Sequence, residues 1–298
     1  MDLVVPYVNC SDQTWQDQLR VHGKITITKN NIVRFRSWGT LRYMFRGVAK
    51  YMPFIDRIVL IVSGPSQVPT WINPNTVKVV YHKDFIPEHH LPTFNSCTIE
   101  SFLPNIKDLS EKFIYTNDDM FPIAMCTEED FFTDGLPNLR FVVHEKYETK
   151  QMFRSQCRSG VNLMMSALGM EPYEPGYIIR PYHITVPMLK STLDKVQELC
   201  GDKIDAAATM LRKERNINQY IYSYYHYFTD TYVDKILAYK YFELCDKYFA
   251  DICSTILESK YQYVCLNDST KLKDYGRTRG DLIAIFKKKF PDRCQYEG

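Results

Sequence analysis

The stretch "KFIYTNDDMF", residues 112–121, decides the fold. Its apolar run at 113–115 is typical of a buried strand, and Asn117, Asp118 and Asp119 follow that run almost at once. Adjacent carboxylates repel each other, and burying them costs free energy unless a positive charge lies between them. The stretch therefore predicts a buried strand that delivers two acids to a cation site.

The rest of the first half alternates short apolar runs with helical patterns. Strands are expected at 2–8, 57–63, 76–82 and 112–116, and helices at 35–51 and 94–103. This β-α-β-β-α-β order predicts an α/β fold of Rossmann-like type, with a mostly parallel sheet flanked by helices.

The second half turns mainly helical, with patterns at 161–169, 186–200 and 218–228 that indicate a helical cap. One more strand is expected at 261–268 and a last helix at 281–291. We expect a single catalytic domain over residues 1–298. Its parts would be a nucleotide- and metal-binding α/β part at 1–149, a mainly helical part at 150–235, and a C-terminal part at 236–298 that completes the fold.

Composition and charge are those of an ordinary globular protein, with 45% hydrophobic residues and a net charge of +2. No basic block indicates a nucleic-acid partner. The nine cysteines are odd in number and form no CxxC pair, which argues against a zinc site and favours a reducing compartment. No secretory or spanning segment is evident, so we expect a cytoplasmic protein. Peripheral association with the inner membrane face and a homodimer both stay open.

Asp118 and Asp119 are the first candidates for chemistry. Ligands bind outside the carboxyl ends of strands in parallel α/β sheets, which is where these acids would lie. Two carboxylates with the amide of Asn117 form a hard-oxygen site suited to Mg²⁺ or Mn²⁺ holding a diphosphate. The alternative is an Asx turn or a helix N-cap, for which the same residues serve well.

The predicted helix at 35–51 carries Arg42, Arg46 and Lys50 on one face. Like charges at this spacing are destabilising by about 0.2–0.5 kcal/mol per pair, so either acids elsewhere in the fold or a bound anion should offset them. A solvated basic face is the commoner interpretation. Arg42 is our candidate for a phosphate contact.

Asn95, Ser96 and Glu100 lie at the start of a predicted helix, where backbone N–H groups favour an anion. Helix capping by Asn95 or Ser96 explains those two residues equally well. Glu100, a turn later, is less easily explained by capping.

His183 lies in a proline-bounded loop, where it could act as a general base or hold a phosphoryl oxygen. Arg212 and Arg215 could neutralise charge on a transferring phosphoryl group. A structural histidine and a charge cluster at a helix start are the alternatives.

Four blocks in order resemble the Stealth family of sugar-1-phosphate transferases. They are "DLVVPYVNCSD" (2–12), "RFRSWGTLRYMFRGVAKY" (34–51), "LPTFNSCTIES" with "LSEKFIYTNDDMF" (91–121), and "YVCLND" (263–268). The family includes bacterial capsule-type polysaccharide phosphotransferases and the animal enzyme that starts the mannose-6-phosphate tag. The resemblance implies a GT-A-type fold and transfer of sugar 1-phosphate from a UDP-sugar to a hydroxyl of an acceptor glycan, with release of UMP.

The resemblance also implies roles for individual residues. Asp118 and Asp119 would hold Mg²⁺ or Mn²⁺, with Asp268 as a further metal-proximal acid. Arg42 and Arg212 would bind phosphoryl oxygens, and His183 would act as base or phosphate ligand. The remaining implied substrate-binding residues are Asp2, Asn9, Asp12, Arg34, Asn95, Ser96, Glu100 and Asn117.

This sequence departs from the family pattern at several positions. Ser37, Trp38 and Thr40 stand where Asp, Asn and Glu are usual, Cys97 replaces a common His, and Pro6-Tyr7 replaces Thr-Trp. Because of these departures, the resemblance does not identify the donor sugar or the acceptor. Two alternatives remain: a conventional GT-A glycosyltransferase that releases UDP, and a non-catalytic, glycan-binding member of the family.

Overall fold

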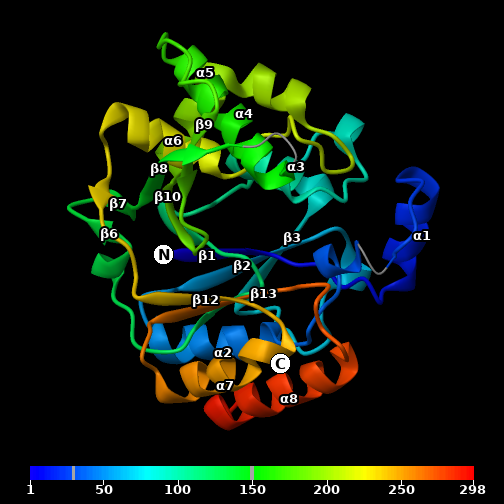
Figure 1. Ribbon diagram of the computed structural model, residues 1–298. Coiled ribbons are helices and arrows are strands. Elements are labelled where there is room, and N and C mark those ends of the chain that lie inside the picture. The colour runs from blue at the N-terminus through cyan, green and yellow to red at the C-terminus, as the bar shows by residue number, and fades with distance from the viewer. Residues whose placement is uncertain (29–30, 148–150) are drawn as a thin grey trace. The chain divides into compact units, whose positions relative to one another are not determined.

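The computed structural model describes residues 1–28, 31–147 and 151–298 (Figure 1). The chain forms two compact units, each assembled from separate segments. Unit 1 contains Met1–Val80, Tyr115–Asp130 and Leu237–Gly298, and unit 2 contains Tyr81–Ile114 and Phe131–Ile236. Among the described residues, no helix has both the length and the apolar character needed to cross a membrane.

Unit 1 is built on two groups of strands. In the first, β1 (Asp2–Pro6) pairs in parallel with β2 (Arg57–Val62), and β3 (Val77–Tyr81) is the next neighbour of β2. In the second, β12 (Tyr239–Glu243) runs parallel to β13 (Tyr263–Asn267), which pairs antiparallel with β5 (Met120–Pro122). The apolar runs of β1 and β2 are buried throughout, as expected of parallel strands covered on both faces. The predicted α/β fold is confirmed.

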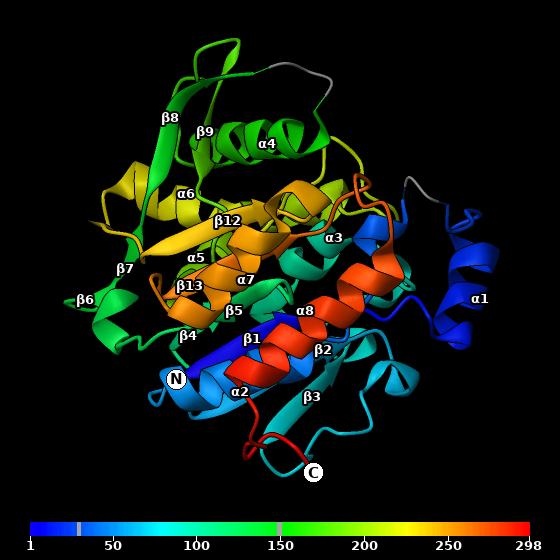
Figure 2. The ribbon, with the colours of Figure 1, turned by 60° about the horizontal axis from the view of Figure 1, so that its bottom comes forward.

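The helices of unit 1 are α1 (Gln13–His22), α2 (Leu41–Tyr51), α7 (Phe249–Glu258) and α8 (Tyr275–Lys289). Helix α2 packs on β5. Helix α7 packs on α8, as both ribbon views show (Figures 1 and 2). Unit 1 also has short 3₁₀ turns at η1 (Ile32–Arg34), η2 (Pro65–Gln67), η6 (Glu128–Asp130) and η7 (Asp246–Tyr248).

Helix α2 is shorter than the sequence pattern predicts, because it begins at Leu41 and not near residue 35. Gly39 has a φ of +72°, a left-handed conformation that ends any helix before it. Nη2 of Arg279 lies 2.6 Å from where a Cβ of residue 39 would be, but this is the end of a flexible side chain that can move, so the backbone conformation is what favours glycine here. The residues before Gly39 are thereby released to line the site described below.

Unit 2 combines short strands with three long helices. Its helices are α3 (Ser96–Ser101), α4 (Met152–Ala167), α5 (Lys190–Ala207) and α6 (Tyr220–Thr229), with 3₁₀ turns η3 (His82–Asp84), η4 (Glu88–His90) and η5 (Leu103–Asn105). Its strands are β4 (Lys112–Tyr115), β6 (Phe132–Thr133), β7 (Leu136–Leu139), β8 (Phe141–Lys146), β9 (Tyr177–Pro181), β10 (Val186–Leu189) and β11 (Val233–Asp234).

The helix predicted from residue 186 begins only at Lys190. Residues 186–189 form β10 instead. Pro187 disfavours the helical conformation for the residue before it and holds this segment extended. The predicted helices at 161–169 and 218–228 are present within α4 and around α6.

A buried acid offsets the cations on α2. Arg46 donates from Nε and Nη2 to the two carboxylate oxygens of Glu297, at 2.6 and 2.9 Å, and from Nη1 to the carbonyl of Phe290. The Glu297 side chain is only 2% exposed. Its pKa is lowered because the hydrogen bonds and charge of Arg46, with smaller help from Arg42, outweigh the burial that would raise it. This ion pair fixes the C-terminal segment to α2.

We predict that Arg46→Ala destabilises the protein by about 3 kcal/mol, because Glu297 is left buried with only part of its compensating charge. Arg42 Nε remains 3.3 Å from Glu297, which keeps the loss at the low end for a broken buried pair. Arg20→Ala, which breaks an exposed pair with Asp17, should cost less than about 1 kcal/mol and serves as control. Urea denaturation measures both, and equal losses would contradict this account.

Candidate active site

Polar side chains of unit 1 gather just past the carboxyl ends of strands. Tyr7 follows β1, Asp118 and Asp119 follow β4, and Asp268 follows β13. Two backbone hydrogen bonds hold the acidic stretch: Thr116 donates to the carbonyl of Val4, and the carbonyl of Asp119 accepts from the N–H of Leu266. The edge at which ligands bind in parallel α/β sheets is therefore lined with acids.

The acids strongly perturb one another. Burial, together with the negative charges of Asp119 and Asp268, raises the pKa of Asp118 to about 7 against an opposing backbone hydrogen bond. Beneath them, burial and the charge of Asp119 raise the pKa of the Cys265 thiol well above its ordinary value, so that the thiol stays neutral. The neutral form of Asp118 is therefore favoured up to about pH 7.

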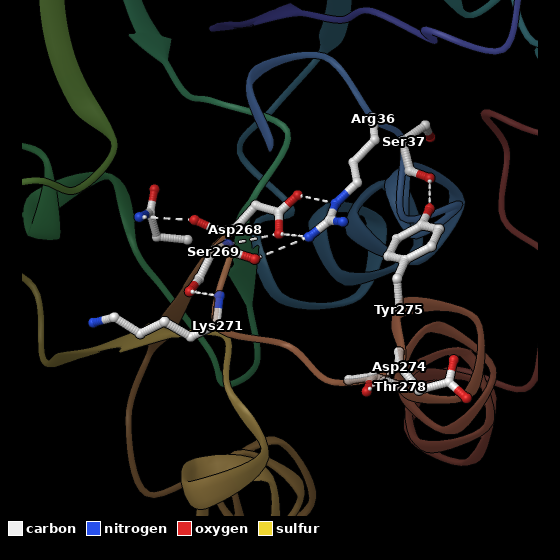
Figure 3. A network of polar contacts seen from close by, with 9 residues as sticks. Arg36, Ser37, Asp268, Ser269, Lys271, Asp274, Tyr275 and Thr278 are labelled. Atoms are coloured by element: carbon white, nitrogen blue, oxygen red, sulfur yellow. Dashed lines mark hydrogen bonds and ion pairs between the residues drawn. The ribbon is translucent and has the colours of Figure 1, made fainter. Parts of the chain in front are cut away.

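Arg36 compensates one of the three acids (Figure 3). Its Nε and Nη2 both donate to the carboxylate of Asp268, and Nη2 also donates to the carbonyl of Ser269 at 3.1 Å. The guanidinium lies over the ring of Tyr275, 4.4 Å from its centroid, and near the ring of Trp38 at 5.3 Å. Aromatic faces and a bidentate partner thus fix this arginine in one orientation.

Two of the departures from the family pattern contact each other. The hydroxyl of Tyr7 lies 3.1 Å from Oγ of Ser37, and Tyr275 donates to the carbonyl of Ser37 at 2.7 Å. Burial raises the pKa of Tyr7, and the nearby charge of Asp118 contributes to the rise. Trp38, a third departure, packs edge-on to Tyr275. Its buried indole N–H has no acceptor among the described residues.

The first block places two predicted residues together and a third apart. Asp12 caps α1, and its carboxylate accepts hydrogen bonds from Ser66 and Gln67, each at 2.7 Å. The amide of Gln67 also accepts from the backbone N–H of Asn9 and donates to its carbonyl. Burial raises the pKa of Asp12, but these hydrogen bonds outweigh it and lower the pKa. Asp2 lies at the opposite, amino end of β1, buried and paired with Arg57, its register partner on β2. The structure therefore does not bring Asp2 to the edge where Asn9 and Asp12 lie.

The predicted arginines of the second block have different surroundings. Arg34 is exposed at the end of η1. Arg42 interacts with Glu297 and lies over the ring of Trp71, 5.1 Å from its centroid. Arg36, which lies between them in the sequence, contacts the acidic cluster through Asp268. Sequence reasoning missed Arg36, although its place between two aromatic residues, Phe35 and Trp38, was a usable signal.

In unit 2, Asn95 and Glu100 hold segments together. Asn95 is fully buried; its Oδ1 caps α3 at the N–H of Cys97, and its Nδ2 donates to Thr209 and Asn216. The capping interpretation therefore holds, and these contacts occupy the side chain that we predicted to bind substrate. Glu100 Oε2 accepts from the N–H of Gln219 at 2.9 Å, at the start of α6, where the helix dipole stabilises a carboxylate.

Two further predicted residues of unit 2 meet. Arg212 donates to Oγ of Ser96, which joins the loop after α5 to the first residue of α3. Arg212 lies in a loop, so the alternative of a charge cluster at a helix start does not describe it. His183 lies between β9 and β10, with Nδ1 3.4 Å from the hydroxyl of Tyr220.

The donor set fits a divalent metal ion. Asp118 and Asp119 supply carboxylate oxygens and Asn117 an amide oxygen, the ligand types that Mg²⁺ and Mn²⁺ prefer. The raised pKa of Asp118 reflects its burial and the neighbouring negative charges, and a bound dication would offset both. Asp268 differs from the other two acids, because Arg36 already engages both of its oxygens.

Comparison with known proteins connects this arrangement to a family. A family model described as Stealth protein CR2, conserved region 2, matches residues 34–151. A capsular polysaccharide phosphotransferase WcwK of Streptococcus pneumoniae is 27% identical over all of this chain and 98% of its own length. The exopolysaccharide phosphotransferase cps2G of Lactiplantibacillus plantarum is 28% identical over all of this chain and 96% of its own length.

A solved structure, the inositol-1-phosphate CTP transferase of T. maritima, covers 96% of each chain with a TM-score of 0.40 and 12% identity. Likeness at that level supports no functional assignment. The family model lies across the second and third resembling blocks, and the relatives extend over the first and last as well. The chain is thus similar to Stealth proteins over conserved region 2 and to polysaccharide phosphotransferases over its whole length.

Proposed function

We propose that this protein transfers sugar 1-phosphate from a UDP-sugar to a hydroxyl of an acceptor glycan, forming a phosphodiester and releasing UMP, in the synthesis of cell-surface polysaccharide. The relatives' names as polysaccharide phosphotransferases support the reaction class. The observation that carries the proposal is the cluster of Asp118, Asp119 and Asp268 behind the ends of β4 and β13, where Arg36 engages Asp268.

Charge explains why such a cluster suits phosphoryl transfer. Asp118 and Asp119 would hold Mg²⁺ or Mn²⁺, which when bound would neutralise the diphosphate of the donor. Arg36 orients Asp268 through two hydrogen bonds, so that the third acid would lie near the metal without competing for its ligand positions. Phosphoryl transfer depends mainly on positioning and charge stabilisation, and this arrangement supplies both.

The roles of the remaining residues are part of the same proposal. Asn9 and Asp12 would lie at the nucleotide end of unit 1. In unit 2, Arg212 and Ser96 would bind phosphoryl oxygens as a pair, and His183 would act as base or phosphate ligand. The nine cysteines are free thiols, which supports a reducing, cytoplasmic environment.

The acids equally suit a conventional glycosyltransferase, because both reactions use a nucleotide-bound divalent ion. The two differ in the bond that breaks. Attack on the β-phosphorus releases UMP, whereas attack on the anomeric carbon releases UDP. The released nucleotide therefore separates the two functions.

We predict that incubation with a panel of UDP-sugars and acceptor glycan yields UMP and a phosphodiester resonance in ³¹P NMR spectra. EDTA should abolish turnover, and excess Mn²⁺ should restore it. Asp118→Asn should lower kcat by about 100-fold or more, since metal-assisted charge stabilisation is worth several kcal/mol. Asp281→Asn, on the exposed face of α8, is the matched control and should retain full activity.

Release of UDP in place of UMP would assign the chain to conventional glycosyl transfer. Donor binding without turnover, unaffected by Asp118→Asn, would favour the non-catalytic alternative.

A second prediction concerns the pH dependence of stability in metal-free protein. The folded-state pKa of Asp118, about 7, lies above its ordinary value of 3.8, so ionisation opposes folding increasingly from about pH 4 to pH 7. Asp118→Asn should therefore raise Tm at pH 8 and have little effect at pH 4. We expect Tm to rise by about 2–4 °C for each kcal/mol gained in the free energy of unfolding. Thermal unfolding of both proteins in EDTA measures the difference in Tm. A rise in Tm that is the same at pH 4 and pH 8 would contradict the raised pKa of Asp118.

A third prediction concerns Trp38. A buried N–H without an acceptor costs about 1–3 kcal/mol, and an acceptor on a bound donor sugar or nucleotide would recover part of it. Trp38→Phe should raise KM for the donor about tenfold with kcat changed less than about twofold. Trp71→Phe, in the same unit, is the control. Unchanged KM in Trp38→Phe would show that this indole does not contact the donor.

A further inference from the structure

We propose that His89, His90 and Asp205, all in unit 2, form a second metal site, for a divalent transition-metal ion of the Zn²⁺ class. The histidines are consecutive residues of η4, and the aspartate lies near the end of α5. One candidate ligand atom from each lies within 4.8 Å of the others. This cluster shares no residue with the proposed site for sugar-phosphate transfer.

The distances between the ligand atoms match those of a coordinated ion. Nε2 of His90 lies 3.0 Å from Oδ1 of Asp205, and Nε2 of His89 lies 3.5 Å from the same oxygen. Zinc binds imidazole nitrogen and carboxylate oxygen at about 2.0–2.2 Å, which sets tetrahedral ligand atoms about 3.3 Å apart. The two distances lie on either side of that value, so an ion could enter with little rearrangement.

The helix ending at Ala207 makes a cation favourable here. Asp205 is in the last turn of α5, where the negative end of the helix dipole disfavours a carboxylate. The candidate ligands facing it are two imidazoles, and a neutral imidazole can donate only one hydrogen bond and carries no net charge. A bound dication would offset both the carboxylate and the dipole.

The rings are positioned as a partly preformed site requires. The His90 side chain is only 12% exposed and packs on Phe102, with ring centroids 5.3 Å apart. The His89 ring lies 4.1 Å from that of His90, centroid to centroid, and its side chain is 65% exposed. One ligand is thus anchored, while the exposed one leaves an entry route and room for water at the remaining coordination positions.

The ligand types favour zinc over magnesium. Two imidazole nitrogens and one carboxylate suit Zn²⁺, whereas Mg²⁺ prefers oxygen ligands in octahedral geometry. This chemistry differs from the acidic cluster of unit 1. Excess Mg²⁺ should therefore occupy hard-oxygen sites without displacing zinc from the histidines.

The metal would connect two segments that carry candidate substrate-binding residues. η4 leads into the segment of Asn95 and Ser96, and α5 leads into the loop of Thr209 and Arg212. These segments already bond through Asn95 to Thr209 and through Arg212 to Ser96. We infer a structural role, in which zinc fixes the ends of both segments.

The test uses the full-length protein, stripped with a chelator and titrated with ZnCl₂ by calorimetry in excess Mg²⁺. We expect one zinc site per chain and a rise in Tm on binding. His89→Gln and Asp205→Asn should each weaken binding more than about tenfold and lose the rise in Tm, while keeping the metal-free Tm. His22→Gln and Asp202→Asn, exposed residues on α1 and α5, are the matched controls and should bind as wild type.

Spectra of the Co²⁺-loaded protein should show nitrogen and oxygen ligation without a thiolate charge-transfer band, because no cysteine belongs to the site. Absence of zinc binding in the wild type, equal binding by His89→Gln and Asp205→Asn, or a thiolate band would each overturn the proposal. These readouts need no activity, so they stand apart from any failure of the proposed transferase function.

Discussion

Electrostatic repulsion among three carboxylates is the constraint on which the candidate site depends. Asp118 and Asp119 follow β4, Asp268 follows β13, and the packing within unit 1 brings their charges together. Arg36 compensates Asp268, and the pKa of Asp118 rises to about 7 as a result of its burial and the negative charges of Asp119 and Asp268. A fold that keeps such a cost without function would be unusual, since perturbed acids concentrate at functional sites.

Local sequence patterns predicted much of this framework. The apolar runs that became β1, β2, β3, β4 and β13 were recognisable because buried parallel strands need continuous apolar residues. Asn95 as an N-cap followed from the same kind of local chemistry. Errors arose where one residue overrode a periodic pattern. Gly39 moved the start of α2, and Pro187 turned the beginning of a predicted helix into β10.

Long-range pairing was beyond local reasoning. Arg36 and Asp268 are 232 positions apart, and Arg46 and Glu297 are 251 apart, so no window of sequence contains either pair. The same limit explains why Glu100 resisted interpretation, because its partner is the start of α6. The strand-end pattern identified Asp118 and Asp119 and the family resemblance added Asp268, but neither identified Arg36, which binds Asp268. The contact between Tyr7 and Ser37 further indicates that departures from the family pattern form a connected group, which is where donor specificity would reside.

The central claim is that Asp118 and Asp119 bind one divalent ion together with a nucleotide diphosphate. Electron paramagnetic resonance of Mn²⁺ titrated into the protein, with and without UDP, tests it most directly. The account predicts one bound Mn²⁺ whose affinity rises when UDP is present, and loss of that binding in both Asp118→Asn and Asp119→Asn. Mn²⁺ binding that is unaffected by either substitution, or indifferent to UDP, would contradict it.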